Sequence, residues 1–108
     1  MKIIDTGDKI LSGDNHPQLK IGNKLYTVDD RKSTWDKIQE IQADESIPDD
    51  KKDEKLLTLA LGKDAYKEIT GDKDFSVSGN TALIFYVMSA ITGEDYEELK
   101  KAARERKN

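Results

Sequence analysis

The 108-residue chain has no cysteine and a single histidine, His16. Without cysteine it can form no disulfide, no zinc-thiolate site and no catalytic thiolate. His16 precedes a proline in a segment rich in turn-forming residues, and no second histidine is present to complete a metal site or a nucleophile-base pair. We interpret His16 as an exposed loop residue and expect no catalytic residues, no metal site and no cofactor.

Phosphate-binding and calcium-binding motifs are also missing from the sequence. Gly62-Lys63 and Gly71-Asp72 lack the companion glycines of a phosphate loop. The stretch from Asp72 to Ser76 begins like a calcium loop, but Val77 stands at the position that requires glycine and Leu83 at the position that requires glutamate. The chain is therefore not expected to be an enzyme.

Charge is plentiful but balanced: 37% of the residues are charged, 35% are hydrophobic, and the net charge is -4. Only residues 100–107 are locally basic, so we expect no nucleic-acid partner, which would need a concentrated positive field. The longest apolar run, residues 81–92, is shorter than the ~20 residues of a membrane-spanning helix. The first residues lack the apolar core of a signal peptide, and cytoplasmic residence is expected, with no membrane association.

The run at residues 81–92 is interpreted as a helix that is apolar nearly all round. At about 100° per residue, its core face carries Leu83, Ile84, Val87 and Ile91. Phe85 lies instead on the stripe that carries the polar residues Thr81, Ser89 and Thr92. Two interpretations stay open: a central core helix, or a helix with a partner-binding face around Phe85.

The rest of the chain predicts a single domain, residues 1–108, whose fold class is α+β and mostly α. It divides into a turn-rich N-terminal segment (1–17), a β-hairpin with a Gly22-Asn23 turn (18–28) and a helical region (30–106). The helical region is expected to form a compact bundle of four to five helices.

Capping residues and glycines predict where these helices begin and end. Ser33 and Asp36 resemble a capping pair for a helix at about 30–43, and Thr92 and Asp95 resemble one for the last helix. The intervening helices are expected to end at the glycines Gly62 and Gly71, and Ser76 or Ser78 is expected to cap the apolar helix.

Three segments, in this order along the chain, carry a family resemblance. They are residues 21–30 leading into the helix of Trp35, Ile38 and Ile41, then residues 59–69, then residues 84–94. This arrangement resembles the small tail assembly chaperones of long-tailed, siphovirus-type bacteriophages and prophages. The resemblance implies a noncatalytic protein of the host cytoplasm that holds the tape measure protein before tail tube subunits polymerise around it. It also implies self-association, the tail tube protein as a further partner, and a longer form made by ribosomal frameshifting.

A partner-binding surface is predicted at Phe85 and Met88, together with Leu56 and Leu59 of the preceding apolar helix. Methionine would let such a surface accept varied sequences, and an apolar helix groove suits a helical partner. Two alternatives remain: a structural phage subunit, such as a head-tail connector or tail completion protein, or a host protein-binding adaptor.

Overall fold

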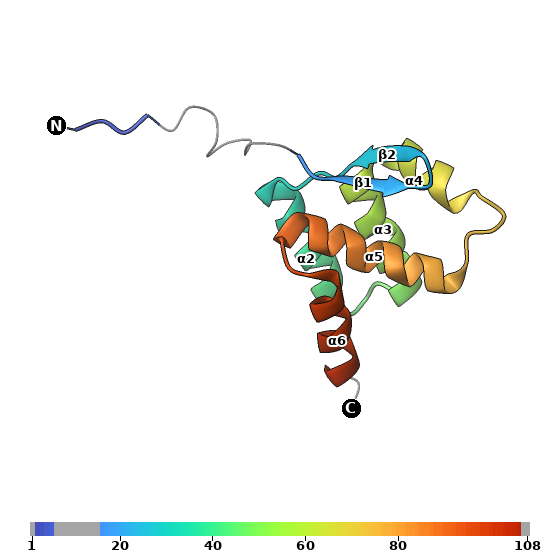
Figure 1. Cartoon of the computed structure of the whole chain (residues 1–108). Helices are drawn as coiled ribbons and strands as arrows, with labels where there is room; N and C mark the ends of the chain where they lie inside the picture. Colours follow the sequence, from blue (N-terminus) through green and yellow to red (C-terminus); the bar gives the residue numbers. More distant parts are fainter. Residues whose placement is uncertain (1, 6–15, 107–108) are drawn as a thin grey trace.

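The computed structural model describes residues 2–5 and 16–106, and residues 2–5 have no secondary structure. Within these residues a two-stranded hairpin precedes five helices, as expected for the mostly α class (Figure 1). The elements are β1 (Gln18–Ile21), β2 (Lys24–Thr27), α2 (Lys32–Ala43), α3 (Asp49–Leu61), α4 (Lys63–Thr70), α5 (Val77–Thr92) and α6 (Tyr96–Arg106). Most of the predicted turn-rich segment 1–17 lies outside the described residues.

The hairpin forms where the sequence predicts it. β1 and β2 pair antiparallel, with Leu19 opposite Tyr26, and Gly22 takes a φ of 61° that lets the two-residue turn close. Leu19 and Tyr26 pack against the helical core. Just beyond β2, Val28 is fully buried, which anchors the hairpin to the helices.

The predicted capping pair of Ser33 and Asp36 is wrong. α2 begins at Lys32, before Ser33, and its N-cap Arg31 makes no side-chain capping bond. The carboxylate of Asp29, two residues upstream, instead accepts a hydrogen bond from the Arg31 backbone N–H at 3.1 Å. An aspartate outside the helix therefore orders the turn that leads into α2.

Glycine ends α3 and α4 as predicted. Gly62 follows the last residue of α3 with a φ of 90°, a conformation that residues with a Cβ rarely adopt. Gly71 follows α4 directly. The start of α5 is also as predicted, because the Ser76 hydroxyl accepts a hydrogen bond from the Gly79 N–H at 2.9 Å.

The second predicted capping pair, Thr92 with Asp95, is wrong. Thr92 is the last residue of α5, and its hydroxyl donates to the Met88 carbonyl oxygen at 2.8 Å. Gly93 then ends α5 in the left-handed conformation. Because Thr92 still belongs to α5, it cannot cap α6.

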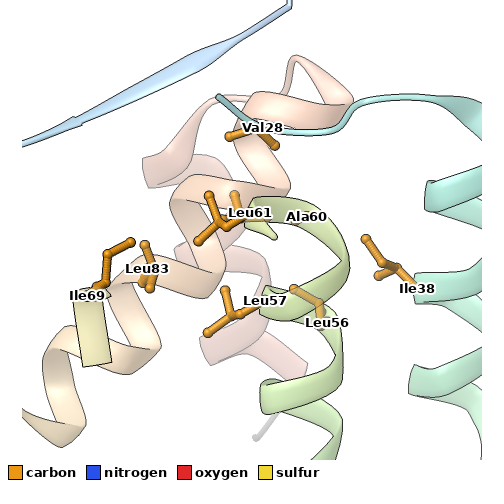
Figure 2. Packing of buried hydrophobic residues seen from close by; sticks show 9 residues of the cluster. Val28, Ile38, Leu56, Leu57, Ala60, Leu61, Ile69 and Leu83 are labelled. Atoms are coloured by element: carbon orange, nitrogen blue, oxygen red, sulfur yellow. The ribbon is translucent and has the colours of Figure 1, made fainter. Parts of the chain in front are cut away.

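The core is built around α3 rather than around the long apolar helix. α3 contributes Leu56, Leu57, Ala60 and Leu61, while α5 contributes Leu83 and Val87. Figure 2 shows Leu56 facing Ile38 of α2, and Leu57 and Leu61 lying on the side of α3 toward Leu83. The remaining members of the buried cluster are Val28 and Ile69.

α5 is covered on several sides, as its all-round apolar character predicts. It contacts α3, β1 and α6. Its predicted core residues Leu83 and Val87 are buried, and Ile84 and Ile91 are half-buried against the same cluster. No helix in the described part of the chain is both long and apolar enough to cross a membrane.

Candidate protein-binding surfaces

Phe85 belongs to a small aromatic cluster that we define as Phe85, Tyr86 and Tyr96. The Tyr96 ring meets Phe85 edge-on, with the centroids 6.3 Å apart, and stacks on Tyr86 with the centroids 4.0 Å apart. Both geometries are favourable for aromatic rings. Among the described residues, the side chains that pack against the main core include Ile84 and Met88 but not Phe85. The aromatic cluster is thus a second, separate contact that joins α5 to α6.

α6 extends away from the helical body (Figure 1). It packs on α5, and its apolar stripe of Leu99, Ala102 and Ala103 is half-buried without joining the main core cluster. The first turn carries Glu97 and Glu98, which suits the helix dipole. A helix of about three turns is only marginally stable by itself in water. α6 therefore depends on the aromatic cluster for its stability, and it is a region where further contacts can form.

The structure does not bring the four predicted binding residues onto one surface. Phe85 lies in the aromatic cluster, whereas Met88 and Leu59 are half-buried against the core. Leu56 is 1% exposed, so it is a core residue and cannot contact a partner of the folded chain. Tyr86, 47% exposed, was not predicted as a binding residue. In the sequence, the feature that could have pointed to Tyr86 is its position directly after Phe85.

A groove of about 990 Å³ runs between the hairpin and the first half of α5; we call it the hairpin groove. Its apolar lining includes Leu19 and Ile21 of β1, facing Phe75, Ala82 and Tyr86. Tyr86 therefore belongs both to the groove and to the aromatic cluster, which makes the two surfaces continuous.

One end of the hairpin is held to α4 by Glu68. Its carboxylate pairs with the Lys24 ammonium and accepts a hydrogen bond from the Tyr26 hydroxyl at 3.2 Å. The Lys24 hydrogen bond is the main reason that the pKa of Glu68 is lowered, and the same bond raises the pKa of Lys24. The pKa of Tyr26 is raised by burial first and by Glu68 second. These contacts fix one wall of the groove.

The loop end of the groove is acidic. Asp72 and Asp74 line it, and the Asp72 carboxylate accepts a hydrogen bond from the Asp74 N–H at 2.9 Å. None of the ion pairs found among the described side chains, those of residues 2–5 and 16–104, includes either carboxylate. The groove therefore combines an apolar lining with two carboxylates at its loop end, while Lys20 and Lys24 also line it.

The acidic start of α3 shows no sign of a metal site. The pKa of Asp53 is raised, mainly by burial and then by the nearby Asp49 and Asp50. Across the described residues, no group of three or more potential metal ligands comes together. His16 is exposed, as predicted, with its Nδ1 3.1 Å from the Asp30 carboxylate.

Comparison with protein-family models, curated proteins and solved structures finds no match to this chain.

Proposed function

We propose that the chain is a noncatalytic tail assembly chaperone of a long-tailed phage, which binds the tape measure protein in the host cytoplasm during tail morphogenesis. The observation that supports this most directly is the aromatic cluster outside the core, joined to an amphipathic helix that extends from the body. Aromatic side chains at the edge of a small charged domain are typical anchors for protein partners.

The tape measure protein that the proposal requires is long and largely helical. A helix presents apolar side chains at intervals of three and four residues. α5 and α6 pack together, and this pair of helices carries the half-buried Phe85 and the apolar stripe of α6, with Met88 one turn further along α5. Binding of a helical partner to such a surface gives weak contacts that several copies of the chaperone can repeat along one partner.

A binding experiment with two variants of α5 tests the site. Phe85→Ala should weaken binding to the purified tape measure protein by about tenfold or more in isothermal titration calorimetry, because it removes an aromatic anchor. Val77→Ala is the matched control: Val77 lies on the same helix, is 87% exposed and does not belong to the aromatic cluster. Circular dichroism establishes that both variants are folded. Unchanged affinity of a folded Phe85→Ala variant would reject the site.

Mass spectrometry of purified virions separates this function from its nearest alternative. A chaperone acts before the tube is complete and should be absent from the finished particle. A head-tail connector or tail completion subunit would be present in stoichiometric amount, and finding the chain there would overturn the proposal.

A further inference from the structure

α6 is held against α5 by aromatic rings and small apolar side chains. Tyr96, the first residue of α6, stacks on Tyr86 and meets Phe85 edge-on. Of residues 96–104, whose side chains the structure describes, none forms a side-chain hydrogen bond or an ion pair with α5. The attachment of α6 therefore depends mainly on the rings.

α6 is also the helix that adds nothing to the main core. Within residues 96–104 no residue is fully buried, and none belongs to the core cluster or packs against it. Among the described elements, α6 makes an extensive contact only with α5. Elements with few buried apolar contacts open at a lower free energy than the core does. α6 can therefore leave α5 while the hairpin and the helices around α3 stay folded.

A short link, residues 93–95, gives α6 a point about which to turn. The Glu94 carbonyl oxygen accepts a hydrogen bond from the Ser89 hydroxyl at 2.5 Å, which fastens this part of the link to α5. The Asp95 carbonyl oxygen accepts instead from the Leu99 N–H at 3.0 Å and so belongs to the first turn of α6. The hinge is thus the backbone between Glu94 and Asp95, and hinges commonly lie at such ends of elements.

α6 has the residue pattern of a helical ligand for α5. Its half-buried residues recur at intervals of three and four and form one apolar face: Tyr96, Leu99, Ala102 and Ala103. Through Tyr96 it covers Phe85, the side chain that the proposed function assigns to the partner. Because two helices cannot occupy the same face of α5 at once, α6 and a helical partner compete for it.

We propose that α6 is a lid over the face of α5 that carries Phe85 and Tyr86, and that a helical segment of the partner displaces it. The segment is an amphipathic helix that places an aromatic or large apolar side chain against the two rings, as Tyr96 does in the closed lid. α6 turns on its link, so its apolar stripe stays available to the same partner. The identity of the partner rests on the proposed function, whereas the lid is a property of this chain alone.

Hydrogen exchange of the full chain, followed by mass spectrometry, tests the lid without any partner. Tyr96→Ala removes both ring contacts, so the amides of residues 97–104 should exchange about tenfold faster, while those of α3 keep their wild-type rates. Alanine favours helix more than tyrosine does, so faster exchange in α6 reports loss of docking and not a weaker helix. Lys101→Ala, exposed on the same helix, is the matched control and should leave α6 protected. Unchanged exchange of α6 in Tyr96→Ala would overturn the lid, and so would equal acceleration of the α3 amides.

Isothermal titration calorimetry with the tape measure protein tests the displacement. A partner that binds only the open state has its affinity reduced by the closed fraction. Tyr96→Ala should therefore bind more tightly than the wild type, by the same factor of about ten that hydrogen exchange measures. Phe85→Ala keeps the close stack of Tyr96 on Tyr86 but removes the anchor for the partner, so its affinity should fall.

The opposite signs of these two effects separate the lid from the binding site. Weaker or unchanged binding of Tyr96→Ala, beside a loss of affinity in Phe85→Ala, would overturn the displacement and leave the proposed site standing. Wild-type affinity of a folded Phe85→Ala variant would reject the proposed site, and hydrogen exchange would still decide whether α6 opens as a lid.

Discussion

Replacing Asp29 by asparagine should destabilise the protein in a pH-dependent way. The Asp29 carboxylate accepts hydrogen bonds from the Arg31 guanidinium at 2.9 and 2.8 Å and from the Thr34 hydroxyl at 2.8 Å. Thr34 is a buried polar side chain, so its hydroxyl depends on this partner. The Arg31 hydrogen bond is the main cause that lowers the pKa of Asp29 from 3.8 to about 2.

The size of the effect follows from this pKa. At 1.36 kcal/mol per pH unit, the difference between 3.8 and about 2 corresponds to about 2.4 kcal/mol of stability at neutral pH. The side chain is 26% exposed, so solvent screening reduces this contribution to about 1–2 kcal/mol. Because the pKa is depressed in the folded state, this stability is fully present above pH 3.8. It is lost as the pH falls from 3.8 toward 2.

Urea unfolding followed by Trp35 fluorescence measures the effect, since Trp35 is the single tryptophan and is half-buried on α2. Asp29→Asn should lower the free energy of unfolding by about 1–2 kcal/mol at pH 7, and its difference from the wild type should shrink toward pH 2. Asp36→Asn is the control: its exposed ion pair with Lys32 should contribute less than about 0.5 kcal/mol. A difference between Asp29→Asn and wild type that does not change between pH 7 and pH 2 would refute the reasoning.

Two further substitutions test the fold. Leu57→Ala should lower the free energy of unfolding by about 2–5 kcal/mol in urea titrations, because Leu57 is fully buried in the core; a loss below about 1 kcal/mol would contradict its position there. Ser76→Ala should cost about 1 kcal/mol in the same assay through loss of the α5 cap, whereas Ser33→Ala should be nearly neutral because Ser33 does not cap α2. Equal effects of the two serine substitutions would contradict this assignment of the caps.

The hairpin and the helix ends, which depend on residues close together in the chain, were predictable from the sequence. The Gly22-Asn23 turn between β-favouring segments predicts the hairpin, and glycine at positions 62 and 71 predicts the ends of two helices. These residues act through backbone geometry and need no distant partner. The wrong capping pairs, Ser33 with Asp36 and Thr92 with Asp95, show the limit of such signals. A capping pair marks the start of a helix only if its serine or threonine lies just outside that helix. The preceding turn decides whether it does.

The burial of the proposed binding residues was predictable only in part, because periodicity tells which residues share a face but not what covers it. Leu83 and Phe85 lie about 200° apart on a helix, so the sequence correctly separated the core face from the Phe85 stripe. It gave no indication that Leu56 would be fully enclosed between α3 and α2.

By itself the sequence determined the hairpin, the helices and the core face of α5, since turns, glycines and apolar spacing act over a few residues. Only the tertiary structure decided that α3 forms the centre of the core and that Tyr96 covers Phe85. The tertiary structure also decided that an apolar groove lies between the hairpin and α5. These features depend on how elements that are distant in the chain pack together. The direction that α6 takes after Gly93, for example, is not encoded in the local residue pattern of α5 or of α6.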